Sequence, residues 1–216
     1  ETCANPATNP ATSNIITITV NPLLDVAVAI SEDLNNICAG TDVTFTANPT
    51  NGGTNPVYAW YVNGVVQPGE VAATFTYAPA NGDQVYATLT SDETCANPAT
   101  NPATSNIITI TVNPLLDVAV AIVADDFNVC TNTSVTFTAT PTNGGVNPVY
   151  AWYVNGVVQP GETAATFTYT PSDGDQVYAT LTSDETCANP ATNPASSNII
   201  DVEVYPIPTT SPIWHD

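Results

Sequence analysis

Apolar and polar residues alternate along short stretches of the chain, and this alternation predicts β-strands. Val43, Phe45 and Ala47 fall on one face of the segment 43–47 and threonines on the other, the period-two pattern of a half-buried strand. Comparable stretches recur at short, even spacing, at 25–30, 57–62, 65–67, 73–77, 83–89 and 105–112. No stretch carries the 3.6-residue period of a helix. We therefore expect an all-β protein.

Aromatic residues at strand positions predict the core. Trp60 and Trp152 lie in mid-strand, just before Asn-Gly hairpin turns, where a β-sandwich commonly places its central aromatic residue. The predicted core residues are Trp60, Trp152, Phe45, Phe137, Phe75 and Phe167. Aromatic side chains can also form a sugar-binding platform, and the better candidates for that role are the neighbouring tyrosines, Tyr58, Tyr61 and Tyr86.

The chain repeats itself almost letter for letter. The segment that starts at Glu1 returns at Glu93 and again at Glu185, an interval of 92 residues, which is about the size of one immunoglobulin-like sandwich. The sequence thus predicts tandem immunoglobulin-like β-sandwiches in a linear array. The expected divisions are a terminal loop and strand of a preceding repeat at 1–22, a first repeat at 23–114, a second at 115–206 and a Pro-rich tail or linker at 207–216.

The segment 1–22 has two interpretations. It contains a strand pattern, with Ile15, Ile16, Ile18 and Val20, but not the rest of a sandwich, and a lone apolar strand invites pairing. Either the sequence is a window cut from a longer array, or the segment is a donor strand that completes a neighbouring molecule by strand addition.

The charge of the chain excludes several partners. It has 20 Asp and Glu residues, no Lys and no Arg, for a net charge of −20. Binding to nucleic acid and to anionic membranes depends on cations, so neither is expected. No apolar run approaches the roughly 20 residues that span a bilayer, so direct membrane insertion is not expected either.

The carboxylates are either solvated or available to a divalent cation. Asp25 and Asp117 lie at the repeat junctions, and Asp92 with Glu93 flanks a long loop. Oxygen ligands of this kind can hold calcium between domains. No EF-hand or nonapeptide calcium motif is present, so no cofactor or metal is predicted, with calcium as the alternative.

Catalytic groups are scarce. The single histidine, His215, lies in the tail, where it would be a poor base for a Ser–His or Cys–His pair. Without Lys or Arg, no cationic side chain can stabilise an oxyanion or a phosphate. We predict that the protein is not an enzyme.

Five cysteines, Cys3, Cys38, Cys95, Cys130 and Cys187, are too widely spaced for a zinc site and are expected in disulfides in a secreted chain. Pairing within repeats would join Cys38 to Cys95 and Cys130 to Cys187, and leave Cys3 for a partner outside the unit. In a simple sandwich those positions lie at opposite ends, about 20 Å apart. The alternative joins Cys38 to Cys187 and so links successive repeats. The sequence leaves both open.

Several motifs resemble the PKD-like or immunoglobulin-like tandem repeats of large secreted surface proteins of Bacteroidetes, including adhesins of gliding bacteria. They are the segment 37–47, Tyr58-x-Trp60-x-x-Asn63-Gly64, Gly82-Asp83-x-Val85, and Leu89-Thr90-Ser91 leading to Cys95 and Ser105-Asn106. The resemblance implies an extracellular location at a bacterial cell surface. The chain has Ala87 and Ala179 where many relatives carry a cysteine, so their usual disulfide pattern is not carried over.

Two functions from different classes follow. The first is structural: a segment of a stiff extracellular stalk or filament of adhesin type, with neighbouring repeats or copies of the same protein as partners, assembled in one version by strand complementation. The second is a tandem module that binds carbohydrate or surface polymers, such as surface glycans, through repeated weak contacts.

Overall fold

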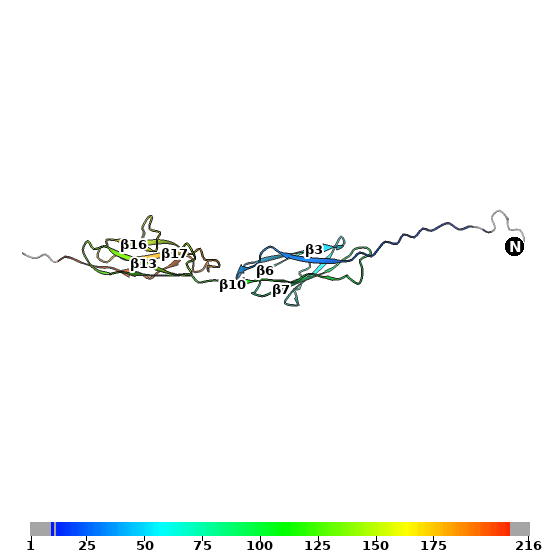
Figure 1. Ribbon diagram of the computed structural model, residues 1–216, viewed down its shortest axis with the longest axis horizontal. Coiled ribbons are helices and arrows are strands. Elements are labelled where there is room, and N and C mark those ends of the chain that lie inside the picture. Colours follow the sequence, from blue (N-terminus) through cyan, green and yellow to red (C-terminus); the bar gives the residue numbers. More distant parts are fainter. Residues whose placement is uncertain (1–9, 11, 208–216) are drawn as a thin grey trace, which may run out of the picture. The chain divides into compact units, whose positions relative to one another are not determined.

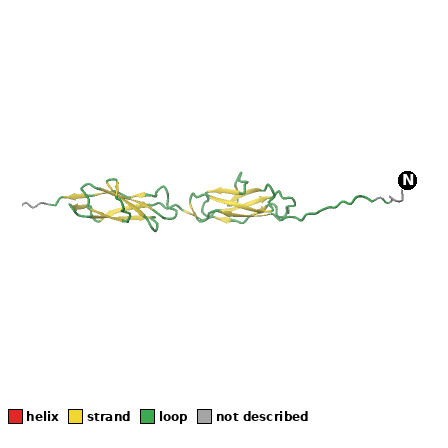
Figure 2. Cartoon of the chain, turned by 90° about the horizontal axis from the view of Figure 1, so that it is seen from above, coloured by secondary structure: helices red, strands yellow, loops and turns green. Residues whose placement is uncertain are grey.

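The computed structural model describes residues 10 and 12–207, and within them the chain consists of strands and loops without a helix (Figure 2). Residue contacts divide it into two compact units. The first unit contains the described residues up to 33 together with 43–77 and 83–109. The second contains 34–42, 78–82 and the described residues from 110 onward.

Each 92-residue repeat supplies ten strands in the same order. The first repeat has β1 (Ala27–Glu32), β2 (Ile37–Cys38), β3 (Val43–Thr50), β4 (Val57–Val62), β5 (Val65–Val66), β6 (Thr74–Tyr77), β7 (Gln84–Thr90), β8 (Ala103–Thr104), β9 (Ile108–Thr109) and β10 (Val112–Asn113). The second has β11 (Ala119–Ala124), β12 (Asn128–Cys130), β13 (Val135–Thr142), β14 (Val149–Val154), β15 (Val157–Val158), β16 (Thr166–Tyr169), β17 (Gln176–Thr182), β18 (Ala195–Ser196), β19 (Ile200–Asp201) and β20 (Glu203–Tyr205).

Two sheets form each sandwich (Figure 1). One has the order β1-β3-β6, and the other the order β5-β4-β7-β8 with β9 also paired to β7. A short parallel pair, β2 with β10, accompanies them. The second repeat has the same arrangement, with β11-β13-β16, with β15-β14-β17-β18 plus β19, and with β12 parallel to β20. The chain is two immunoglobulin-like β-sandwiches in tandem, and the predicted fold class is confirmed.

The alternation in the sequence becomes the alternation of burial. On β3, Val43, Phe45 and Ala47 are buried, while Thr46 between them is exposed. The central side chain is Trp60, which is fully buried and lies 5.7 Å from Phe75 between ring centroids. Its indole N–H donates to the carbonyl of Ala72 at 2.9 Å, so the one polar atom of the side chain is satisfied.

The second repeat reproduces this core. Trp152 is fully buried, 5.5 Å from Phe167 and 6.3 Å from Phe137, and its indole N–H donates to Ala164 at 2.9 Å. All six aromatic residues expected in the core are therefore buried, because Phe45, Phe75, Phe137 and Phe167 are also 5% exposed or less.

The strand predicted at 105–112 is divided in the structure. β9 pairs with β7, whereas β10 pairs with β2 in a different sheet, so the chain changes partner between them. Side chains hold the segment before β9: Ser105 Oγ accepts from Ala87 N–H at 3.0 Å, and Asn106 bonds both backbone groups of Ile30, at 2.8 and 3.1 Å. The prediction of a single continuous strand was wrong because these side chains take the place of ladder hydrogen bonds.

Residues 12–22, the described part of the expected terminal loop and strand, form no strand in the structure. The side chains of Ile15, Ile16, Ile18 and Val20 are 77–92% exposed. Ile108 and Ile110, the counterparts of Ile16 and Ile18 one interval later, are buried within a sandwich, whereas Ile107, the counterpart of Ile15, is 60% exposed. The strand pattern alone does not form a strand because a strand needs a partner. The domain boundaries at 23–114, 115–206 and 207–216 stay predictions, and residues 208–216 lie outside the described part.

Candidate functional site

A disulfide joins Cys38 to Cys187, which are 149 residues apart in the sequence. Their Cα atoms are 5.3 Å apart, within the usual range for a disulfide. Cys38 belongs to the first repeat and Cys187 to the second, and both residues lie in the second compact unit. The bond is therefore a covalent connection between successive repeats of the sequence.

The parallel pair of β2 and β10 positions Cys38. Cys38 stands opposite Asn113 in this pair, and the N–H of Ala39 donates to the Asn113 carbonyl at 2.9 Å. A turn follows at once, in which the N–H of Thr41 donates to the Cys38 carbonyl at 3.1 Å. The backbone on both sides of Cys38 is thus held by hydrogen bonds.

The loop after β17 positions Cys187. Its φ of 65° is in the left-handed region, which residues other than glycine seldom adopt. The Cys187 carbonyl accepts from Leu116 N–H at 2.8 Å, and Asn189 N–H donates to the Leu116 carbonyl at 2.8 Å. The loop is therefore attached to the segment that leads into β11.

The structure contains one of the two cysteine pairings left open by the sequence. It contains the Cys38–Cys187 bond, and the bonds within repeats are not formed. Cys95 and Cys130, expected in disulfides, are free thiols, because the observed bond takes one cysteine from each of two successive repeats. Cys3 lies outside the described residues.

Asp92 and Asp184 accept hydrogen bonds from an adjoining loop. Both carboxylate oxygens of Asp92 accept from the N–H of Asn55, at 3.0 and 3.1 Å, and Asp184 repeats this with Asn147. The pKa of each carboxyl is held below its ordinary value, first by this backbone donor and then by the Asn side chain. These carboxylates fix loop structure.

The other calcium candidates also lie within hydrogen-bonded loops. Asp25 accepts from the Asn97 side chain at 2.7 Å, and Asp117 accepts from Asn189 at the same distance. The backbone N–H of Glu93 donates to Ser91 Oγ at 3.0 Å. In the part of the chain that the structure describes, no three His, Cys, Asp or Glu side chains gather where they could hold a metal ion.

Two tyrosine pairs lie on the outer faces of the larger sheets. The rings of Tyr61 and Tyr86 are stacked at 4.7 Å with an interplanar angle of 2°, and Tyr153 and Tyr178 are stacked at 4.6 Å. The first pair lines an open groove of about 450 Å³ together with Thr88, Thr104, Ser105 and Ile107. Tyr58 is buried, and burial raises the pKa of its phenol, so it is not available to a ligand.

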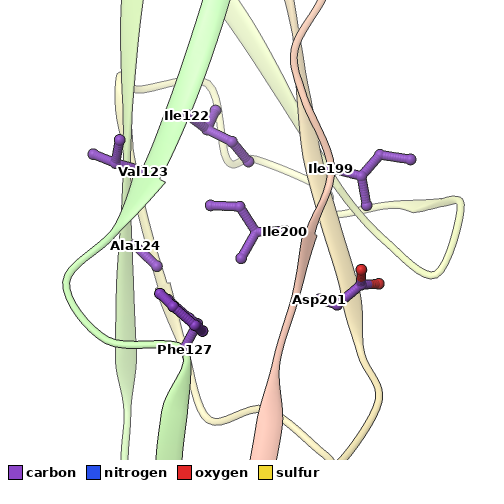
Figure 3. Close-up of a pocket in the computed structure, with 7 residues that line it drawn as sticks. All are labelled: Ile122, Val123, Ala124, Phe127, Ile199, Ile200 and Asp201. Carbon is purple, nitrogen blue, oxygen red and sulfur yellow. The ribbon is translucent and has the colours of Figure 1, made fainter.

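A second groove, of about 450 Å³, opens between β11 and β19 (Figure 3). It is lined by Ile122, Val123, Ala124, Phe127, Ile199, Ile200 and Asp201. The sequence reasoning missed it. The signal was in the difference between repeats, because Val123, Ala124 and Phe127 replace Ser31, Glu32 and Asn35 of the first repeat.

Comparison with known proteins found no matching family model. Among curated proteins, the chain is similar to the highly immunogenic outer capsid protein of Enterobacteria phage T4, with 34% identity over 135 residues. The match covers 59% of this chain and 35% of the capsid protein. The chain thus spans about a third of the length of that relative.

Solved structures with a similar course of the chain include the three N-terminal domains of the bacteriophage RB49 Hoc protein, with 15% identity, a TM-score of 0.38 and coverage of 83% of this chain and 59% of that one. Another is the fibronectin(III)-like modules of Clostridium thermocellum CbhA, with 14% identity, a TM-score of 0.33 and coverage of 87% and 100%. Among the described residues, no helix is long and apolar enough to cross a membrane.

Replacing Gly53 by Ala is expected to destabilise the first repeat more than replacing Gly64 by Ala. Both glycines have nearly the same positive φ, 81° and 79°, so both variants lose about 1 kcal/mol from backbone strain. Only at Gly53 would the new Cβ collide with the Asp92 carboxylate and lie 2.6 Å from the Glu93 nitrogen. Urea unfolding of the two variants measures the difference, and equal losses would show that the Asp92 loop does not approach Gly53.

Replacing Asp92 or Asp184 by Asn is expected to lower the melting temperature more at pH 7 than near pH 2.5. The folded-state pKa of each carboxyl is lowered, so its stabilising contribution is present above the unfolded value of about 3.9 and is lost as the pH falls through the folded value. Calorimetry at both pH values tests this. Glu70→Gln is the control for the loss of one negative charge, and a deficit as large near pH 2.5 as at pH 7 would contradict the expectation.

Proposed function

We propose that this chain is a structural segment of an extracellular repeat protein that forms a stiff stalk or filament at the cell surface. Its sandwiches act as rigid units, and their function comes from number, spacing and connection. The observation that carries the proposal is the disulfide between successive repeats.

A covalent bond between repeats has a mechanical consequence. Two domains joined by the main chain alone can move apart until the connecting segment is extended, because non-covalent contacts between domains are weak. The Cys38–Cys187 bond adds a second connection at a different point of the chain. Two connections restrict bending and share a pulling force, as a stalk or filament requires.

The location proposed for the chain is a surface in an oxidising environment. Disulfides persist outside the cytosol, and a net charge of −20 keeps a displayed chain soluble through self-repulsion. The similar phage protein is named as an outer capsid protein, which supports exposure on the outside of a particle. The motifs shared with bacterial adhesin repeats favour a bacterial cell surface, and this finer location is part of the proposal.

Catalysis has no place in this proposal. Carboxylates such as Asp92 and Asp184 are engaged with loop amides, and the tryptophans are fully buried in the cores. No cofactor is assigned. The partners proposed are neighbouring repeats or further copies of the same chain, and strand addition by the exposed segment 12–22 is one way in which copies can associate.

The alternative function is binding of surface glycans by the tyrosine pairs. Sugar rings stack on flat aromatic surfaces, and Tyr61 with Tyr86 forms such a surface beside an open groove that also contains hydroxyl groups of Thr88 and Thr104. The equivalent pair in the second repeat would double the weak contact and add avidity.

Peptide mapping under non-reducing conditions tests the structural proposal. Cleavage before aspartate places the five cysteines on separate peptides, which a trypsin-like protease cannot do because Lys and Arg are absent. We expect a linked pair of peptides containing Cys38 and Cys187. Small-angle X-ray scattering should then show a broader range of dimensions for Cys38→Ser than for Cys130→Ser, which removes a free thiol. Detection of Cys38–Cys95 instead would refute the proposal.

A glycan array probes the alternative. Specific retention of the chain that falls at least tenfold on replacing Tyr61 and Tyr153 by Ala would favour a binding module. Val65→Ala with Val157→Ala, at exposed hairpin positions, is the matched control. No retention of any glycan, or retention unchanged by the tyrosine substitutions, would contradict the binding function and leave only the structural role.

A further inference from the structure

We propose that the free thiols Cys95 and Cys130 are the two halves of one more bridge of the Cys38–Cys187 kind, and that a second copy of this chain completes it. Cys130 of one copy bonds to Cys95 of the next, and copies join in one direction, head to tail. The inference rests on the proposed structural function, in which successive repeats are covalently connected.

The repeat interval assigns each free cysteine a bonded counterpart. Cys130 lies 92 residues after Cys38, and Cys187 lies 92 residues after Cys95. The observed bond joins the Cys38 position of one repeat to the Cys187 position of the next. Applied once more, the same relation joins Cys130 to a following loop of the Cys95 type.

The loop around Cys95 has the bonded geometry without the bond. Its φ is 69°, against 65° at Cys187, although nothing is attached to its sulfur. The Cys95 carbonyl accepts from Leu24 N–H at 2.9 Å, as the Cys187 carbonyl accepts from Leu116. Residues 92–103 are also identical in sequence to 184–195. These hydrogen bonds stabilise the left-handed backbone of Cys95 in the absence of a disulfide. Cys95 is therefore pre-organised for a partner.

The strand that carries Cys130 repeats the setting of Cys38. β12 is parallel to β20 as β2 is to β10, with Cys130 opposite Tyr205. The turn after it has the same hydrogen bond, from Thr133 N–H to the Cys130 carbonyl at 3.1 Å. The side chain of Cys130 is exposed, so a second chain can reach it.

The surroundings of Cys130 carry more negative charge than those of Cys38. Asp126, Asp173 and Glu203 replace Leu34, Asn81 and Thr111 of the first repeat, whereas Ala124 and Ser134 replace Glu32 and Asp42. The loop that would meet them is itself acidic, with Asp92 and Glu93 beside Cys95. Like charges slow the encounter of two copies and salt screens them, so the bond should form faster as the ionic strength rises.

The chemistry is a thiol–disulfide exchange with a small disulfide as the oxidant. The Cys130 thiolate attacks oxidised glutathione, forms a mixed disulfide and releases one glutathione thiolate. The Cys95 thiolate of the second copy attacks the Cys130 sulfur, forms the new bond and releases the second glutathione thiolate. The two protein thiols are oxidised by two electrons, the glutathione disulfide is reduced, and the two released thiolates take up the protons that the cysteines lose.

Two variants of the full chain test the direction of joining, both with Cys3→Ser. Cys95→Ser keeps only the free thiol of Cys130, and Cys130→Ser keeps only that of Cys95. Incubated together with oxidised glutathione, they should form a single disulfide-linked dimer, in at least tenfold excess over the dimer that either forms alone. Aspartate-directed cleavage should yield a peptide pair with Cys130 and Cys95, and the parent with both thiols should form a ladder of oligomers. Raising the salt concentration from 0.01 to 0.15 M should increase the rate at which the mixed dimer forms.

The inference is overturned if the mixed dimer forms no faster than Cys130–Cys130 or Cys95–Cys95 dimers, or if no dimer forms. The same digest reports on Cys38 and Cys187. If that pair is linked and the mixed dimer is absent, only the joining of copies fails. If Cys38 is found bonded to Cys95 of its own chain, the proposed function fails as well.

Discussion

The packing of a buried indole between two sheets is the interaction on which each repeat depends. Trp60 and Trp152 each lie within 6.3 Å of two phenylalanine rings, and their N–H groups are satisfied by a carbonyl of the segment before β6 or β16. A closely packed core whose polar groups are hydrogen-bonded fixes the position of one sheet on the other. The loops that carry the cysteines leave these sheets at defined points, so their geometry follows from the core.

A chain without Lys or Arg must hold its loops by other means than ion pairs. Here the carboxylates accept from backbone amides and from asparagine and threonine side chains, as Asp92 does with Asn55 and Asp25 does with Asn97. Hydrogen bonds from neutral donors leave the negative charge in place. The surface therefore repels other copies at the same time as the loops are ordered, and a covalent bond is the kind of connection that can oppose this repulsion.

Much of the fold could be predicted from the sequence because it depends on local alternation and on the repeat interval. The strand at 43–47, which the structure extends to Thr50, the strand at 57–62, the Asn63-Gly64 turn and the buried tryptophans all follow from residue patterns. What could not be predicted depends on side chains that replace backbone partners. Asn106 bonding to Ile30 divides the last strand, and the left-handed Cys187 shapes a loop in a way that no residue type indicates.

The disulfide shows where geometric reasoning from a sequence ends. Strand length alone argued against a Cys38–Cys95 bond, but could not select between pairings, because the position of one repeat relative to the next is not encoded in alternation. The difference between the repeats is more informative. The loop around Cys95 is identical to that around Cys187, whereas the region of Cys130 differs from that of Cys38 at Phe127 and Tyr205. If copies or repeats discriminate among partners, most of the discrimination lies on the Cys130 side, since the loop side differs only in the adjoining loop, where Val146 replaces Thr54.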